Sequence, residues 1–163
     1  MANQSTLFVI KPDAIKRGLV GTILSRIEGL RLDIVGIKVM RVSKELAEAH
    51  YTHIRGKPFF EETVDYLQGK LHGIPYVVAL VLYGDDAIER VRRLTGATHP
   101  EKADPVSIRG SLGRMTTNGW MENIIHASAD AKDAAREIPL WFQPQELVRL
   151  ERPALQPAGP HLT

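Results

Sequence analysis

His126 stands in the sequence between Asn123 and Ser128, two small polar residues. An imidazole can act as a nucleophile near neutral pH without an accessory base. No second histidine or carboxylate follows at the spacing of a zinc site, which argues against a metalloenzyme. An isolated histidine can equally be structural, so the spacing alone leaves both interpretations open. The other histidines need no catalytic explanation; they are His50, His53, His72, His99 and His161.

Several cationic side chains could bind a polyphosphate. Guanidinium groups present planar forks of donors, an ammonium group is a compact point charge, and a hydroxyl adds a further donor. The chain contains neither Gly-x-x-x-x-Gly-Lys-Ser/Thr nor Gly-x-Gly-x-x-Gly, so side chains would have to hold the phosphates. Each arginine taken alone is more often solvated than functional. The candidates are Lys11, Arg92, Arg93, Thr98, Arg109 and Arg114.

Two adjacent aromatic residues, Phe59 and Phe60, follow Lys57 and Pro58 at the start of an expected helix. Neighbouring side chains on a helix point in different directions, so only one of the two can readily face the core. The other could stack on a nucleobase, because every base offers a flat face. Core packing of at least one of them is the simpler expectation.

The composition is that of one folded domain. The chain has 163 residues, of which 44% are hydrophobic and 25% charged, and no apolar run approaches the ~18 residues of a membrane-spanning helix. Cysteine is absent, which excludes disulfides and thiolate catalysis. The first apolar run, Leu7 to Ile10, is too short for a secretory signal, so we expect a cytoplasmic protein without a membrane partner. The net charge of +2 is dispersed, which permits anionic ligands but does not indicate nucleic acid.

The first half of the chain alternates expected strands and helices. Residues 7–10 form a short apolar run that predicts a strand buried on both faces, and residues 76–83 form a longer one. Residues 32–42 alternate apart from a slip at Gly36, which predicts a half-buried strand with a bulge. Helical spacing extends over residues 15–30, 44–54 and 59–71, and a further helix should begin after the capping residues Asp85 and Asp86 and end at Gly96.

The second half is less regular. Residues 95–119 lose periodicity and predict a long irregular loop, which in compact domains is usually functional. Residues 123–126 could be a short strand or one helical turn. A helix should begin at Asp130 and stop near Pro139, and we expect a domain over 1–150 followed by a Pro-rich tail over 151–163. These elements predict an α+β protein with a ferredoxin-like, four-stranded antiparallel sheet covered by helices on one face.

Over residues 6–148 the chain resembles the nucleoside diphosphate kinase family, with matching order and approximate spacing. The segments that carry the resemblance are LFVIKPD (7–13), RGLVG (17–21), HY (50–51), KPFF (57–60), GATHP (96–100), IRG (108–110), NIIHAS (123–128) and EIPLWF (137–142). The resemblance implies a ping-pong reaction in which His126 takes the γ-phosphoryl group from a nucleoside triphosphate and passes it to a diphosphate. It also implies that Mg²⁺ accompanies the phosphates, without dedicated protein ligands.

The resemblance further assigns roles to residues of this sequence. Glu137 should orient His126, with Ser128 supporting that contact, and Lys11 should reach the transferred phosphate. Phe59 should stack on the base, which would explain broad tolerance of nucleotides. The residues expected around the nucleotide are Lys11, Tyr51, Phe59, Arg92, Thr98, Arg109 and Asn123, with Arg92, Thr98 and Arg109 on the phosphates and Lys11 and Asn123 near the ribose. The family implies a homo-oligomer, a hexamer or tetramer built from dimers.

Three features depart from the usual family pattern. Thirteen residues separate Arg109 from Asn123, about four more than is common, through the insertion-like residues 115–120. Residues 69–75 look extended, and Ala129 stands where an aspartate often follows the serine. The expected catalytic residues are nevertheless present.

Two other function classes compete with a kinase. Ferredoxin-like sheets also bind RNA or sense ligands, but the aromatic motif of an RNA-binding strand is absent from this sequence. A family member retained only for scaffolding or regulation would be expected to lose catalytic residues. Lys11, Arg109, Asn123, His126 and Glu137 are all kept, so the sequence favours an active nucleoside diphosphate kinase.

Overall fold

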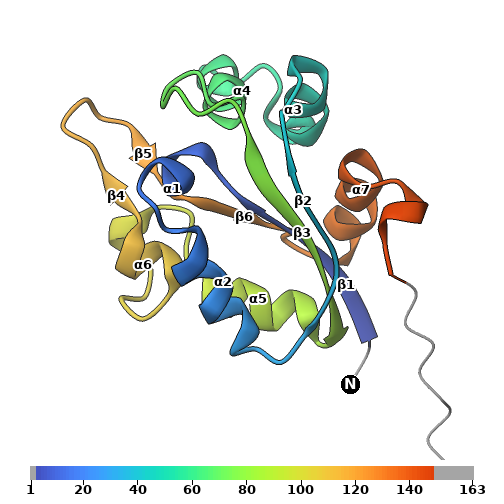
Figure 1. Cartoon of the computed structure of the whole chain (residues 1–163). Coiled ribbons are helices and arrows are strands. Elements are labelled where there is room, and N and C mark those ends of the chain that lie inside the picture. Colours follow the sequence, from blue (N-terminus) through green and yellow to red (C-terminus); the bar gives the residue numbers. More distant parts are fainter. Residues whose placement is uncertain (1–2, 149–163) are drawn as a thin grey trace, which may run out of the picture.

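The computed structural model describes residues 3–148, and the Pro-rich tail predicted for 151–163 lies outside this range. Its main sheet has four strands, β1 (Asn3–Ile10), β2 (Asp33–Met40), β3 (Val77–Asp85) and β6 (Ile125–Ala127). Their order is β2-β3-β1-β6, and every neighbouring pair is antiparallel (Figure 1). The predicted α+β, ferredoxin-like sheet is therefore confirmed. The two most apolar runs of the sequence form its central strands, β1 and β3.

The remaining elements connect and cover these strands. A second, two-stranded ladder joins β4 (Arg114–Met115) to β5 (Met121–Glu122). Within the described range, no helix is long and apolar enough to cross a membrane. The helices are α1 (Pro12–Lys16), α2 (Val20–Glu28), α3 (Lys44–His50), α4 (Phe60–Leu67), α5 (Ala87–Thr95), α6 (Ile108–Leu112) and α7 (Ala131–Trp141), with 3₁₀ turns at Thr52–Ile54, Pro100–Lys102 and Pro144–Glu146.

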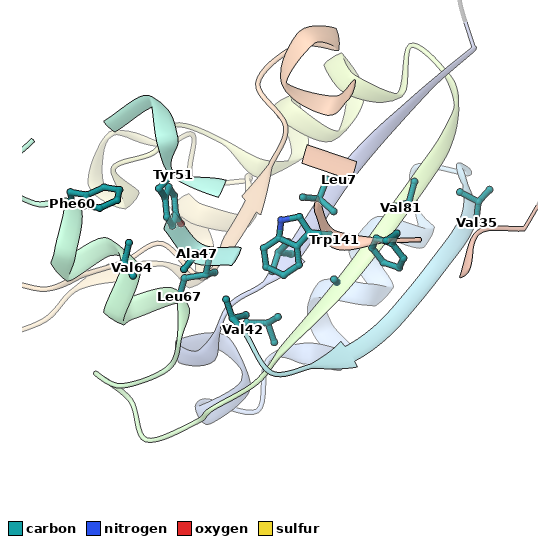
Figure 2. Close-up of a cluster of buried hydrophobic side chains, with 14 residues drawn as sticks. Leu7, Val35, Val42, Ala47, Tyr51, Phe60, Val64, Leu67, Val81 and Trp141 are labelled. Carbon is teal, nitrogen blue, oxygen red and sulfur yellow. The ribbon is translucent and has the colours of Figure 1, made fainter. Parts of the chain in front are cut away.

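Helices cover both faces of the sheet, so the expectation that they cover one face is wrong. Successive residues of a strand point to opposite faces, and in β1 Leu7 belongs to one buried cluster whereas Phe8 belongs to the other. The Leu7 side packs against α3, α4 and α7, as Figure 2 shows for Trp141. The Phe8 side packs against α2, α5 and α6 (Figure 1). A strand that is apolar at every position requires a cover on each side.

The bulge predicted in the second strand is confirmed at Gly36. The register of β2 against β3 shifts between Ile34 and Gly36. A Cβ at Gly36 would lie 2.7 Å from Cδ2 of Leu147 and 3.2 Å from Cε1 of Phe142. A side chain here would require Leu147 and Phe142 to shift, because the segment after α7 crosses β2 closely.

The helix that begins at Asp130 extends further than the sequence predicts. The Asp130 side chain accepts a hydrogen bond from the backbone N–H of Asp133 at 2.8 Å, which confirms the predicted cap. The prediction that the helix stops near Pro139 is accurate to within two residues, since α7 continues to Trp141 with the proline inside its last turns. Trp141 and Phe142 are buried in the core, and this burial outweighs the backbone hydrogen bond that a proline cannot make.

Two further local predictions need correction. The region 95–119 is not irregular throughout, since it contains α6, which is capped by the Ser107 hydroxyl accepting from the Gly110 N–H at 3.1 Å. This five-residue helix is too short for a periodic pattern to reveal it. Asp86 does occupy the N-cap of α5, but its φ is 49° and its side chain makes no capping bond. Gly96 ends that helix with a φ of 84°, as predicted.

Candidate active site

A pocket of about 500 Å³ lies where the end of β1, the α3–α4 region, α6, β6 and α7 meet. The structure brings together residues that are up to 126 positions apart in the sequence. The lining includes nine of the predicted site residues, namely Lys11, Tyr51, Phe59, Arg92, Thr98, Arg109, Asn123, His126 and Glu137. The tenth, Ser128, lies directly behind the lining.

The imidazole of His126 is held from behind by a buried carboxylate. Strand β6 places His126 opposite Val9 of β1, and the His126 Nε2 lies 2.9 Å from Oε2 of Glu137. The Ser128 hydroxyl donates to the same oxygen at 2.7 Å and accepts from the backbone N–H of Leu7 at 3.2 Å. Because an ionised carboxylate only accepts, Nε2 of His126 carries the hydrogen. The lone pair of the neutral ring is therefore on Nδ1.

The surroundings of His126 keep its ring uncharged. Its side chain is 16% exposed, whereas that of Glu137 is 1% exposed. Burial lowers the pKa of His126 well below its ordinary value, and the positive charges of Lys11 and Arg109 lower it further. An unprotonated imidazole is the nucleophilic form, so these shifts favour nucleophilic chemistry at neutral pH.

The backbone immediately before His126 adopts an unusual conformation. Ile124 has a φ of 58°, which a β-branched residue rarely adopts. Its N–H donates to Oδ2 of the buried Asp13 at 3.1 Å, and its carbonyl accepts from the Lys11 N–H at 2.9 Å. These two bonds tie the segment leading to His126 to the end of β1. Strain of this kind is common at functional sites, where the surrounding structure enforces it.

Lys11 and Asn123 form a polar pair in the pocket. The Lys11 Nζ donates to Oδ1 of Asn123 at 2.8 Å and lies 4.8 Å from the centre of the Tyr66 ring. The Asn123 amide nitrogen donates in turn to the Thr98 carbonyl at 3.2 Å. Burial, and secondarily the charge of Arg109, lowers the pKa of Lys11 to about 7. An anionic ligand would offset this cost and restore the charge.

Arg109 is also buried and is oriented by backbone carbonyls. Its Nε donates to the carbonyl of Asn123 at 3.3 Å, Nη2 donates to that of Ile125 at 2.7 Å, and Nη1 donates to that of Gly96 at 3.4 Å. A guanidinium has five N–H groups, so two remain available for a ligand. Burial lowers the pKa of Arg109 to about 10, which leaves it charged at neutral pH.

The remaining predicted residues form the open side of the pocket. Phe59 is 53% exposed and Phe60 is 7% exposed, so one ring faces the pocket and the other faces the core, as the sequence predicted. Arg92 and Thr98 are exposed residues of the same lining. Tyr51 is nearly buried, and burial raises the pKa of its hydroxyl above the ordinary value, so it stays protonated.

Two of the candidate arginines lie elsewhere. Arg93 forms an exposed ion pair with Glu89 at 2.8 Å, and Arg114 pairs with Glu122 at 2.6 Å. Neither residue lines the pocket. Successive residues of a helix point in different directions, so Arg92 lines the pocket whereas Arg93 does not.

Several lining residues were not predicted. Tyr66, His53 and His72 contribute to the pocket, and the buried Asp13 supports it from behind. A signal for Asp13 was present, since it directly follows the motif residues Lys11 and Pro12. His53 and His72 gave no such signal, because their elements reach the pocket only through tertiary packing.

The extended loop and the insertion noted in the sequence meet at the pocket rim. The insertion forms the β4–β5 hairpin, and the loop 69–75 carries His72 against it. The His72 Nε2 lies 3.0 Å from Oε1 of Glu122. The centroids of the His72 and Trp120 rings are 6.1 Å apart. Two separate departures from the family pattern therefore form one structural unit.

A ferredoxin-like sheet that carries a neutral imidazole, a buried carboxylate and two buried cations has the side chains that phosphoryl transfer requires, which points to the phosphotransferases as a class. The family model described as nucleoside diphosphate kinase matches residues 4–147. The chain belongs to the nucleoside diphosphate kinase family.

Similar proteins cover nearly the same length. Nucleoside diphosphate kinase of Pyrococcus horikoshii is 45% identical over 151 residues, covering 93% of this chain and 92% of the relative. A transition state mimic of the Borrelia burgdorferi enzyme with bound vanadate and ADP matches with a TM-score of 0.82 and 35% identity, covering 92% and 93% of the two chains. The Halobacterium salinarum enzyme in complex with CDP matches with a TM-score of 0.81 and 39% identity, covering 93% and 95%.

Proposed function

We propose that the protein is a nucleoside diphosphate kinase that transfers a γ-phosphoryl group between nucleotides through phosphorylated His126. Membership in the family supports this activity. The observation that carries the assignment to His126 is the bond from its Nε2 to the buried Glu137, which leaves the lone pair on Nδ1 of a ring that lines the pocket. The reaction is ping-pong, with one nucleotide site used twice.

In the first half-reaction, the Nδ1 lone pair attacks the γ-phosphorus, an N–P bond forms and the bond from phosphorus to the β,γ-bridging oxygen breaks. The nucleoside diphosphate leaves with the electrons of that bond. The His126 ring gains positive character, which the Glu137 carboxylate stabilises through the Nε2 hydrogen bond. The second half-reaction is the reverse, with a different diphosphate as acceptor. In-line positioning and charge neutralisation supply most of the catalysis in such a transfer.

The nucleotide is held by side chains from separate elements. Arg92, Thr98 and Arg109 bind the phosphates, and the two unused N–H groups of Arg109 suit the equatorial oxygens of the transferred group. Lys11 and Asn123, already paired at 2.8 Å, reach the transferred phosphate and the ribose hydroxyls. Tyr51 lies beside the nucleotide in the same lining. Phe59 stacks on the base without reading its edges, which makes the site tolerant of different nucleotides.

Magnesium would accompany the nucleotide and have no dedicated protein ligands. Mg²⁺ prefers oxygen ligands in octahedral geometry. The one three-residue cluster of possible metal ligands found in residues 3–148 is His50, His126 and Glu137, two of which are nitrogen donors. This donor set does not suit Mg²⁺, so the phosphate oxygens and water would supply its ligands, and the bound cation would supply neutralisation of the phosphate charge.

We further propose that the protein works in the cytoplasm as a homo-oligomer built from dimers, either a tetramer or a hexamer. Apolar side chains of the edge strand β2 support self-association, since Ile37 is 53% exposed and Val39 is 65% exposed. Exposed apolar side chains on an edge strand favour pairing with another chain.

Incubation with γ-labelled ATP and Mg²⁺ tests the proposed reaction. We expect an acid-labile and alkali-stable label on the protein, which then moves to added nucleoside diphosphate. His126→Ala should abolish the label because it removes the Nδ1 that accepts the phosphoryl group. Normal labelling of that variant would refute the assignment, and His53→Ala is the matched control for an exposed histidine of the same pocket.

A further inference from the structure

His50 is a buried histidine that lies against the proposed nucleophile. It ends α3 and is 0% exposed. The centroid of its ring lies 4.3 Å from the centroid of the His126 ring, and the two ring planes are inclined by 79°. The centroid of the Trp141 ring is 5.4 Å away, with an angle of 87° between the planes. The ring thus packs edge to face between the reactive histidine and the indole of α7, which belongs to the buried cluster in Figure 2.

Trp141 determines which nitrogen of His50 carries the hydrogen. The indole Nε1 lies 3.1 Å from Nδ1 of His50. An indole N–H can only donate, so Nδ1 of His50 must accept, and the hydrogen of the neutral ring is on Nε2. The other tautomer and the imidazolium would both place two donors face to face in a buried setting. Burial and the neighbouring His126 also lower the pKa of His50 well below its ordinary value.

The second nitrogen of His50 lies beside the catalytic pair. Its Nε2 is buried and has no hydrogen-bond partner within residues 3–148. Ligand-capable atoms of His50, His126 and Glu137 lie within 4.8 Å of one another. The tautomer leaves His50 with no free lone pair on either nitrogen, so this group of side chains is not poised to bind a transition metal. What remains is a fixed, uncharged ring edge packed against His126.

Such an edge restricts the rotation of His126. The terminal torsion of a histidine is broad and nearly two-fold, so a ring held by one hydrogen bond can turn over, which exchanges Nδ1 with Cδ2 and Nε2 with Cε1 and moves each nitrogen to the other side of the ring. A turned ring would place Nε2 toward the ligand and Nδ1 toward Glu137. The His50 ring opposes this rotation, because a centroid separation of 4.3 Å in an edge-to-face arrangement already places the two rings in van der Waals contact.

We propose that His50, with its tautomer fixed by Trp141, is a positioning residue that holds His126 so that Nδ1 receives the phosphoryl group. This inference rests on the proposed function and adds to it the reason why one ring nitrogen is used. Trp141 acts on His126 indirectly, through its hydrogen bond to His50.

The tautomer can be measured without any activity. In ¹H–¹⁵N correlation spectra of the unphosphorylated protein, we expect His50 to be protonated on Nε2 alone. Trp141→Phe removes the N–H while keeping most of the ring, and it should produce a mixture of tautomers at His50. An Nδ1-protonated His50 in the wild type, or an unchanged tautomer in the folded Trp141→Phe variant, would overturn the inference even if the protein proves to be an active kinase.

The consequence for chemistry is tested by the site of phosphorylation. His50→Ala removes the ring that packs against His126, and it should slow phosphorylation of His126 by about 10- to 100-fold at an unchanged Kd for ADP. Part of the phosphohistidine should move from Nδ1 to Nε2, which ³¹P NMR distinguishes. A protein with both His50→Ala and Trp141→Phe should be no slower than the slower single variant, because both residues act through the same contact with His126.

Wild-type rate and pure Nδ1 phosphorylation in both folded single variants would refute the positioning role. A wild-type protein that takes no phosphoryl group would instead refute the proposed function, and the tautomer spectra would still test the His50–Trp141 pair. If His50→Ala does not fold, Trp141→Phe carries both measurements. Tyr83→Phe, at a partly buried aromatic residue outside the pocket, is the control for general effects on packing.

Discussion

At the scale of single residues, burial sets the protonation states on which the proposed chemistry depends. His126 is kept neutral, Lys11 has a pKa of about 7, and Arg109 stays charged. All three pKa shifts are driven first by removal from water, and positive charges on neighbouring side chains add to each of them. A polyphosphate would compensate this repulsion, so the pocket is electrostatically prepared for an anion.

Removing the Arg109 guanidinium tests the charge that faces the phosphates. Arg109→Ala should lower kcat/KM by a factor of about 10²–10³, equivalent to roughly 2–4 kcal/mol of transition-state stabilisation. Steady-state transfer from ATP to a second diphosphate is the measurement. Arg93→Ala is the matched control, since Arg93 is exposed and outside the pocket, and it should be near wild type. Similar rates for the two variants would show that Arg109 is no phosphate ligand.

Lys11 predicts a pH dependence of nucleotide binding. Its pKa is lowered to about 7, so at about pH 8 most of the free protein has a neutral Lys11. Bound phosphates favour the charged form and raise this pKa, so binding takes up a proton and weakens as pH rises above 7. Calorimetry of ADP binding in buffers of different ionisation enthalpy measures the uptake. Lys11→Met should remove it, whereas Lys16→Met, at an exposed site, should not.

At the scale of elements, the β4–β5 hairpin and the loop 69–75 stabilise one side of the pocket together. Glu122 connects them, since its two oxygens contact Nε2 of His72 at 3.0 Å and Nε of Arg114 at 2.6 Å. The Glu122 and His72 side chains are only 6% and 5% exposed. Asn123 follows directly, so this contact fixes the chain at the point where it enters the pocket.

Neutralising Glu122 should loosen the hairpin. Glu122→Gln keeps the shape of the side chain but weakens both contacts, and we expect the free energy of unfolding to fall by about 1–3 kcal/mol. Urea denaturation measures this loss. Glu89→Gln breaks the exposed pair with Arg93 and should cost at most about 0.5 kcal/mol. Equal effects of the two changes would mean that the buried contact adds nothing to stability.

At the scale of the whole molecule, the sheet has one edge that the described helices leave open. Strand β2 lies at this edge, and its exposed residues Ile37 and Val39 are two positions apart and share a face. The pocket is lined in part by residues of α4, α5 and α7, and none of its lining residues belongs to β2. Self-association through β2 would therefore leave the proposed nucleotide site of each chain accessible.

Charges on this edge should disrupt the proposed dimer. Ile37→Glu combined with Val39→Lys places polar groups on the exposed apolar face, and light scattering should then show a lower molar mass than for the wild type. Val106→Lys is the control, since Val106 is 76% exposed on a loop away from the edge. A wild-type protein that is monomeric, or an unchanged mass in the edge variant, would exclude β2 as the interface.

The amino-acid sequence by itself determined the central strands, the bulge at Gly36, the caps at Asp130 and Gly96, and the membership of the site. Each of these follows from local patterns, either the spacing of apolar residues or a family motif. The tertiary structure alone decided that both faces of the sheet are covered, that α7 continues through Pro139, and that His72 meets Glu122. It also decided the tautomer of His50, which depends on a donor 91 residues away. Burial and hydrogen-bond partners arise from contacts between distant segments, and a local pattern records which residues are apolar but not what they will touch.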